Sequence, residues 1–196
     1  MRPEPSRRLH REDWLQHALE TLHRRGVTGL RVEPLARTLG VTTGSFYWHF
    51  KDRNELLQRV LEHWTESMTA AVGRRMGSSE EPAVQLRRLL VEITREERNR
   101  YETAMRNWAA FDSDAKKAVR KVDECRLAYV MGLFLQMGFD KEQAELRSRM
   151  LVCYQVGEAG FSIRSSMEQR VRLAELRFEL LTHDCGDHRA SPPTLG

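Results

Sequence analysis

Cysteine is scarce in this sequence. Only three cysteines, Cys125, Cys153 and Cys185, occur among 196 residues, and an odd number at wide spacing argues against a framework of disulfide bonds. The sequence also lacks any apolar run near the roughly 20 residues that a membrane-spanning helix needs, and its first residues do not lead into the apolar core of a secretory signal. We therefore expect a cytoplasmic protein without membrane contact, with Cys125 and Cys153 as inert thiols in the helical core.

The motifs of common enzymes are absent as well. The sequence has no Gly-rich phosphate loop, no nucleophile elbow and no His-Glu helix motif with metal-ligand spacing. We therefore expect neither catalysis nor a cofactor. One run, residues 183–188, contains the metal-ligand types of zinc or copper in His183, Cys185 and His188. Because it adjoins a Pro-rich end that has the composition of a disordered tail, we favour the interpretation that it binds no metal. A metal- or redox-responsive protein is the alternative.

Charge is unevenly distributed along the chain. Residues 1–60 hold 11 Lys and Arg against 7 Asp and Glu, whereas the remainder holds 21 of each, so the whole net charge of +4 belongs to the first segment. A cationic surface attracts the phosphate backbone of nucleic acids. A solvated charged surface would have the same composition, so the asymmetry indicates nucleic-acid binding only when a motif supports it.

Such a motif occupies residues 32–51, VEPLARTLGVTTGSFYWHFK. Apolar residues at helical spacing predict a first helix, which Gly40 ends by adopting a left-handed conformation. The Thr42 hydroxyl is expected to cap a second short helix, whose inner face carries Phe46 and Phe50. Two short helices joined by about four residues that include Gly form a helix-turn-helix, in which the second helix enters the major groove of DNA.

The residues from Gly40 to Lys51, followed by Asp52-Arg53-Asn54-Glu55-Leu56-Leu57, resemble the DNA-binding domain of TetR-type (tetracycline-repressor-like) transcriptional regulators. The Gly, the Tyr-x-His-Phe and the acidic-Leu-Leu elements occur in the family's order and spacing, and the resemblance covers about residues 11–61. The rest of the chain resembles the family in length and helical pattern. There the resemblance implies a domain that binds a ligand and dimerises.

By this resemblance, six positions match residues that touch DNA in the family: Thr42, Thr43, Gly44, Tyr47, His49 and Lys51. Thr43 departs from the Lys or Arg often found at its position, which removes the basis for one charged contact. We add Trp48 and Arg37 to the predicted DNA-binding residues. Packing against the following helix is the alternative for Trp48, and a solvated side chain is the alternative for Arg37.

Helical periodicity extends over nearly the whole chain. Asp112 and Asp140 are of the type that opens helices, and Gly26 and Gly138 of the type that ends them. Besides the two helices of the motif, the pattern predicts helices at about residues 10–25, 53–74, 83–98, 101–111, 114–137, 141–164 and 167–183. The sequence therefore predicts an all-α fold of about nine helices.

We divide this fold by function. Residues 1–9 are a basic tail, either disordered or reaching an adjacent DNA groove as an arm. Residues 10–52 form the helix-turn-helix DNA-binding domain, residues 53–74 a connecting helix, residues 75–183 a helical effector-binding and dimerisation domain, and residues 184–196 a disordered tail.

Large apolar side chains are numerous after the motif. They are enough to line an internal cavity, which the family resemblance implies, although such stripes are more often simply core. Phe111, Met150 and Phe161 belong to this group. We assign the ligand site to Trp64, Met68, Tyr101, Met105, Trp108, Tyr129 and Tyr154.

The last predicted helix carries two apolar stripes. One stripe can pack on the chain's own core, and the second, with Leu173, Leu176 and Leu180, needs another partner. Small residues in the preceding helix allow close approach of helices. We therefore predict a two-fold homodimer through a four-helix bundle of the last two helices, and assign to it Gly157, Gly160, Phe161, Val171, Ala174 and Phe178.

Together these features predict a sequence-specific DNA-binding transcriptional regulator. We interpret it as a dimeric repressor that reads a pseudo-palindromic operator in double-stranded DNA. A small, largely apolar or aromatic effector is expected to release it. A ligand-independent repressor or activator is the alternative.

Overall fold

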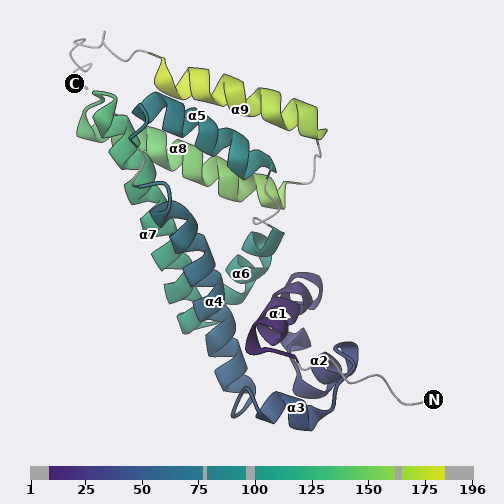
Figure 1. Ribbon diagram of the computed structural model, residues 1–196. Coiled ribbons are helices and arrows are strands. Elements are labelled where there is room, and N and C mark those ends of the chain that lie inside the picture. The colour runs from purple at the N-terminus through teal and green to yellow at the C-terminus, as the bar shows by residue number, and fades with distance from the viewer. Residues whose placement is uncertain (1–8, 77–78, 96–99, 162–164, 184–196) are drawn as a thin grey trace, which may run out of the picture. The chain divides into compact units, whose positions relative to one another are not determined.

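The computed structural model describes residues 9–76, 79–95, 100–161 and 165–183. In these ranges the chain forms nine α-helices, short 3-10 segments and no β-strand (Figure 1), which confirms the all-α prediction. Residues 1–8 of the predicted basic tail and the whole predicted C-terminal tail lie outside the described residues. The helices are α1 (Arg11–Arg25), α2 (Val32–Thr38), α3 (Thr43–Tyr47), α4 (Arg53–Gly73), α5 (Pro82–Arg95), α6 (Glu102–Ala109), α7 (Ser113–Gln136), α8 (Lys141–Gly160) and α9 (Met167–Thr182), and one 3-10 segment is η1 (Val27–Gly29).

Helix starts and ends lie where local chemistry favours them. The Asp112 carboxylate accepts the backbone N–H of Ala115 at 2.9 Å at the start of α7. The Asp140 carboxylate accepts the N–H of Gln143 at 2.8 Å at the start of α8, as an N-cap does. Between these two helices Gly138 has a φ of 94°, a conformation that glycine adopts without strain. Both expected N-caps and the expected glycine turn are therefore confirmed.

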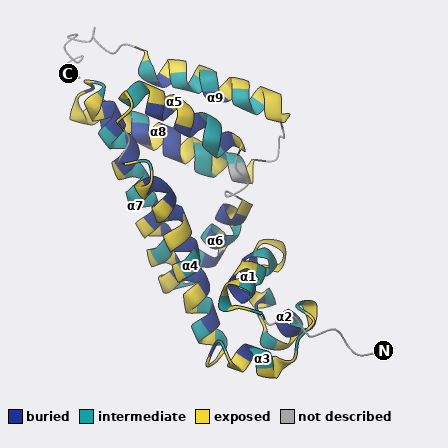
Figure 2. Ribbon diagram, in the orientation of Figure 1, coloured by how far each residue is buried: buried dark blue, intermediate teal, exposed yellow. Residues whose placement is uncertain are grey.

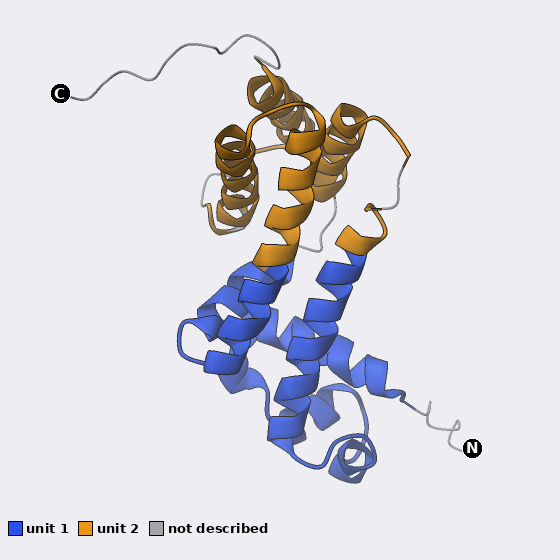
Figure 3. Ribbon diagram, turned by 90° about the vertical axis from the view of Figure 1, so that its left-hand side faces the viewer, with its two compact units in different colours: residues 1–71, 98–122 blue, residues 72–97, 123–196 orange. Residues whose placement is uncertain are grey.

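The chain folds into two compact units (Figure 3). Unit 1 comprises residues 1–71 and 98–122, and unit 2 comprises residues 72–97 and 123–196. Unit 1 is thus assembled from two separate stretches of sequence, whereas the predicted boundaries follow the chain order and assign residues 98–122 to the effector domain. The functional division at residues 52 and 74 stays a prediction.

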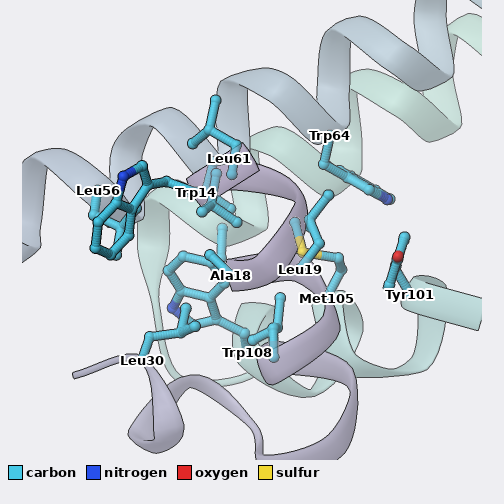
Figure 4. Close-up of a cluster of buried hydrophobic side chains, with 14 of the residues drawn as sticks. Trp14, Ala18, Leu19, Leu30, Leu56, Leu61, Trp64, Tyr101, Met105 and Trp108 are labelled. Carbon is cyan, nitrogen blue, oxygen red and sulfur yellow. The ribbon is translucent and has the colours of Figure 1, made fainter. Parts of the chain in front are cut away.

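The core of unit 1 joins α6 to the N-terminal helices. Ala18 and Leu19 of α1 and Trp64 of α4 contribute to one buried cluster with Met105 and Trp108 of α6 (Figure 4). The helices that contribute to this cluster bury one face and leave the other exposed (Figure 2). The start of α7 completes the core with Ala115, Val119 and Val122.

Unit 2 has its own apolar core. Leu86 and Leu90 of α5, Phe134 of α7 and Ala174 of α9 belong to one buried cluster. Polar contacts add to this packing, because the Arg87 guanidinium of α5 pairs with Glu175 of α9 at 2.8 Å and lies 4.9 Å from the centre of the Phe178 ring. α9 is therefore held against α5 by both apolar and charged groups.

Candidate nucleic-acid interface

The turn between α2 and α3 is built around Gly40. Gly40 has a φ of 70°, and two backbone bonds close the end of α2: the Val41 N–H donates to the Ala36 carbonyl at 3.0 Å, and the Gly40 N–H donates to the Arg37 carbonyl at 3.2 Å. This pair of bonds is the Schellman arrangement, which satisfies the last carbonyls of a helix. The glycine stop predicted from the sequence is confirmed.

The start of α3 differs from the expectation. Thr42 occupies the N-cap position, but its hydroxyl makes no capping hydrogen bond. The backbone closes the first turn instead, since the Ser45 N–H donates to the Thr42 carbonyl at 3.0 Å. The predicted capping by the Thr42 hydroxyl is therefore wrong. The side chain is exposed and its hydroxyl is not used by the cap.

Two aromatic residues fix α3 in unit 1. Phe46 and Phe50 are buried, and their ring centres lie 5.2 Å apart. The Trp14 indole of α1 meets the Phe46 ring edge-on at 5.5 Å. The prediction that Phe46 and Phe50 face the core is confirmed. This anchoring determines which side of α3 is turned outward.

The outward side carries the predicted DNA-binding residues. Trp48 is 89% exposed and Tyr47 is 61% exposed, so the alternative in which Trp48 packs against the following helix is not what the structure shows. His49 is half-buried. The other predicted DNA-binding residues are all exposed: Arg37, Thr42, Thr43, Gly44 and Lys51.

A polar network ties α3 to its neighbours. The Glu55 carboxylate accepts the backbone N–H of Lys51 at 2.8 Å and pairs with Arg11 of α1 at 2.8 Å. The Lys51 N–H, followed by the positive charges of Arg11 and Arg59, lowers the pKa of Glu55. Glu55 therefore stays ionised at neutral pH and links α1, the end of the helix-turn-helix and α4.

Arg53 supports the preceding loop. Its Nε donates to the Leu30 carbonyl at 2.5 Å and its Nη2 donates to the Val27 carbonyl at 3.1 Å. The sequence pattern predicts no role for Arg53 or Arg11. The only signal was that Arg53 and Glu55 fall within the stretch that resembles the family, and spacing alone does not reveal contacts with Val27 and Leu30.

The seven predicted ligand residues are divided between the two units. Trp64, Met68, Tyr101, Met105 and Trp108 pack in the core of unit 1, and Tyr129 packs in the core of unit 2. Tyr154 is 43% exposed on α8. Of the other large apolar residues, Phe111, Met150 and Phe161 are exposed, because Phe111 and Phe161 follow the ends of α6 and α8 and Met150 lies on an outward side of α8. Five of the seven therefore belong to unit 1 and two to unit 2, and their assignment to a ligand site stays a prediction.

A surface hollow of about 480 Å³ lies elsewhere in unit 1. It is formed by the face of α1 that carries Asp13 and His17 together with the turn from Thr38 to Val41. Burial lowers the pKa of His17. None of the predicted ligand residues lines this hollow.

Tyr101 joins α6 to α1 through polar contacts. Its hydroxyl donates to Glu20 at 2.8 Å and accepts from Gln16 at 2.9 Å, and Arg100 contacts both Glu20 and the hydroxyl. The hydrogen bond from Tyr101 lowers the pKa of Glu20, while burial and that same bond raise the pKa of Tyr101. The hydroxyl is thus occupied by protein groups.

Replacing Tyr101 with Phe is expected to lower the stability of unit 1 by about 1–2 kcal/mol, because a hydrogen bond to a charged carboxylate is lost while the ring remains. Urea unfolding followed by tryptophan fluorescence measures it, since all four tryptophans belong to unit 1. Tyr47→Phe is the control, because Tyr47 belongs to the same unit and is 61% exposed. Equal stability of the Tyr101→Phe variant and the unaltered protein would contradict the structural role.

The predicted dimerisation residues differ in their exposure. Gly157, Gly160 and Phe161 are exposed, whereas Ala174 is only 1% exposed, inside the core of unit 2. Val171 is half-buried and Phe178 packs against that core. The exposed stripe of α9 is the other one, with Leu173, Leu176 and Leu180.

The two described cysteines differ in their exposure. Cys125 is half-buried, but Cys153 is exposed on α8, so the expected core position is wrong for Cys153.

Among the described residues no group of three or more His, Cys, Asp or Glu side chains could hold a metal. The alternative metal ligands Cys185 and His188 lie outside the described residues. No helix in the described part of the chain has the length and apolarity to cross a membrane.

Comparison with known proteins shows what this helix-turn-helix is similar to. Residues 15–60 match the family model of bacterial regulatory proteins of the tetR family. The HTH-type transcriptional regulator BetI of Ectopseudomonas mendocina is 26% identical over 151 residues, 73% of this chain and 76% of that protein. The tetracycline repressor protein class D of Escherichia coli is 40% identical over 53 residues, 27% of this chain and 24% of the repressor. This chain thus matches about a quarter of that repressor's length.

Solved structures share the fold over most of the chain. A transcriptional regulator from Rhodococcus sp. Rha1 has a TM-score of 0.71 at 19% identity and covers 88% of this chain and 96% of its own. A TetR-family regulator from Bordetella parapertussis 12822 has a TM-score of 0.67 at 19% identity, with 88% and 94% covered. The family is one of transcriptional regulators, not of enzymes. With residues 15–60 matched by the tetR family model and its fold shared with solved structures along most of the chain, this protein is similar to the TetR-type transcriptional regulators.

Proposed function

We propose that this regulator is a homodimeric repressor that reads a pseudo-palindromic operator with α3 and is released by a small, largely apolar or aromatic effector. The observation that carries the proposal is the two-sided construction of α3. Phe46 and Phe50 are buried, while Tyr47 and Trp48 on the opposite side are exposed. A short helix that is rigidly held and turns polar and aromatic groups outward has the form of a recognition helix.

The exposed groups suit the surface of duplex DNA. Thr42 and Thr43 offer hydroxyls and Lys51 offers a positive charge, the donors that phosphate and sugar contacts use. Gly44 has no side chain, so the backbone can approach the groove closely. Tyr47 and Trp48 combine apolar ring surface with one polar group each, and the His49 ring carries two nitrogens that can form hydrogen bonds. Arg37 of α2 adds a further exposed cation.

Dimerisation supplies the second recognition helix. Two copies related by a two-fold axis would place two α3 helices at half-sites about 34 Å apart, one turn of DNA. Exposed apolar residues on both α8 and α9 of unit 2 support an interface there, because contiguous apolar surface usually marks an interaction site.

Control by an effector requires two states of the dimer that differ in the distance between the two α3 helices. A ligand that shifts the population from mostly competent to mostly incompetent must prefer the second state by about 5 kcal/mol. α4 begins next to the helix-turn-helix and continues from unit 1 into unit 2, which makes it the proposed route of coupling. The aromatic and Met residues assigned to the ligand site favour an apolar or aromatic effector.

Selection of bound DNA from a random pool tests the function as a whole. We expect enrichment of a pseudo-palindrome by the purified full-length protein, and loss of that enrichment when the effector or a cell extract that contains it is added. No salt-sensitive affinity for any duplex, with and without extract, would contradict the proposal.

Replacing Lys51 with Ala tests the proposed phosphate contact. We expect weaker binding to all duplexes and a dependence of log K on log salt that is shallower by about one unit, because one fewer counterion is released. Fluorescence anisotropy at several salt concentrations measures both. The matched control is Lys116→Ala, which removes an exposed lysine of α7 in the same unit. Equal slopes for the Lys51→Ala variant and the unaltered protein would exclude the contact.

A further inference from the structure

The junction between α3 and α4 carries a carboxylate next to a proposed DNA contact. Residues 48–52 connect the two helices, and Glu55 lies in the first turn of α4. Its Oε2 accepts the main-chain N–H of Lys51 at 2.8 Å, while the Asp52 carboxylate accepts the N–H of Glu55 at 2.8 Å. The two bonds run in opposite directions, as the bonds of a capping box do. The main chain of Lys51 is therefore tied to α4.

The other carboxylate oxygen of Glu55 faces two arginines. Oε1 pairs with Arg11 of α1 at 2.8 Å and with Arg59 of α4 at 3.7 Å. The Arg11 guanidinium also lies 5.1 Å from the centre of the Phe50 ring, within the distance of a cation–π interaction. Arg11 is thus held by the residue before Lys51 as well as by the carboxylate, and it offsets the negative charge of Glu55.

Glu55 has two opposite effects on DNA binding. Its charge repels the phosphate backbone, but its hydrogen bond holds the main chain from which the exposed Lys51 side chain extends. The repulsion is weak, because one exposed charge changes an affinity by no more than about fivefold and two arginines lie beside this one. A hydrogen bond to a charged group contributes about tenfold or more. The positioning effect should therefore exceed the repulsion.

Resting on the phosphate contact of Lys51 proposed above, we propose that Glu55 and Arg11 are positioning residues that strengthen DNA binding, although Glu55 is negatively charged. Glu55 fixes the main chain of Lys51, and Arg11 fixes Glu55 from α1. Neither side chain needs to touch DNA. Holding the base of a flexible lysine reduces the conformational entropy that is lost when its ammonium group meets a phosphate.

Replacement of Glu55 with Ala tests the sign of the effect. We expect the dissociation constant for a fluorescein-labelled duplex of mixed sequence, measured by anisotropy, to rise about tenfold. A mixed sequence suffices, because a phosphate contact acts on every duplex. Charge alone predicts the reverse, tighter binding when a carboxylate is removed.

Two conservative variants separate reach from charge. Glu55→Asp keeps the charge but is one methylene shorter, so it should bind DNA more weakly than the unaltered protein. Glu55→Gln loses the charge but keeps a carbonyl oxygen for the Lys51 N–H, so it should recover most of the affinity that Glu55→Ala loses. Equal binding by Glu55→Asp and the unaltered protein would contradict the positioning role.

Combination with Lys51→Ala tests whether Glu55 acts through Lys51. In the Lys51→Ala background, Glu55→Ala should cause no further loss of affinity, because residues that act through one contact are not additive. Arg11→Ala should also weaken binding, and the double variant with Glu55→Ala should lose less than the sum of the two single changes. An additive loss would instead indicate a direct phosphate contact by Arg11 and overturn its positioning role.

Controls separate positioning from folding and from the parent proposal. Glu62→Ala removes another carboxylate of α4, which pairs with the same Arg59 at 2.8 Å, and should not weaken binding. Circular dichroism melts identify a variant that is merely unfolded, in which case Glu55→Asp and Glu55→Gln decide. Lys51→Ala without any effect on affinity overturns the phosphate contact and the positioning with it. If Lys51→Ala weakens binding but Glu55→Ala does not, or weakens it equally in both backgrounds, the positioning alone is overturned.

Discussion

Replacing Phe46 with Ala is expected to lower the stability of unit 1 by about 3–5 kcal/mol and to abolish DNA binding. Phe46 is fully buried between Trp14 and Phe50, and a Phe-to-Ala change at such a site loses apolar burial and leaves a cavity. α3 has only five residues, so its orientation depends on this anchor. Urea unfolding monitored by tryptophan fluorescence gives the stability, and anisotropy with labelled operator gives the affinity.

The adjacent residue provides the control for this prediction. Tyr47→Ala removes a ring of comparable size that is mostly exposed, so stability should change by less than about 1 kcal/mol while operator affinity falls. The two neighbours thus separate folding from DNA contact. If Tyr47→Ala cost as much stability as Phe46→Ala, or if Phe46→Ala bound operator normally, the two-sided description of α3 would be wrong.

Replacing Leu176 with Glu is expected to separate the proposed dimer into monomers and to weaken operator binding by on the order of 100-fold or more. Leu176 of α9 is exposed. A carboxylate there would be desolvated against the apolar side chains of the second copy, which destabilises the dimer. A monomer has a single recognition helix, so it loses the gain in affinity from binding two linked half-sites, typically 10²–10⁴-fold. Sedimentation and anisotropy measured on the same samples test both parts.

Phe111→Glu is the matched control for that change. Phe111 is 95% exposed and belongs to unit 1, so the same apolar-to-acidic replacement occurs on neither α8 nor α9. It should leave both the sedimentation and the affinity unchanged. A Leu176→Glu protein that remains dimeric would show that self-association uses another surface.

Helices and their ends could be predicted from the sequence because the determinants are local. α4 and α7 begin and end within one or two residues of the expectation, since Arg53 follows the Asp52 turn and Gly138 follows the last turn of α7. The inward position of Phe46 and Phe50 also follows from their spacing of four, because the Phe50 N–H still donates to the Phe46 carbonyl at 3.0 Å beyond the end of α3. The predicted DNA-binding residues are exposed, apart from His49, which is half-buried.

Contacts between distant segments could not be predicted in this way. Tyr101 is 81 residues from Glu20 and 85 from Gln16, and no periodicity predicts that α6 packs on α1. Similarly, both stripes of α9 are apolar, and only the packing of Ala174 into unit 2 shows that Leu173 and Leu176 are the exposed ones. Burial of a stripe depends on its partner, which the pattern of one helix does not specify.

The discontinuity of unit 1 affects the order in which the protein acquires structure during synthesis. When residue 71 has left the ribosome, Leu19 and Trp64 still lack Met105 and Trp108, which belong to the same buried cluster. The helix-turn-helix region therefore keeps open apolar surface while the first stretch of unit 2 is translated, and closes only after residue 122 follows. Nascent chains shortened before α6 should be sensitive to protease in α1 and α4, and full protection should arise late, although the DNA-reading segment is made first.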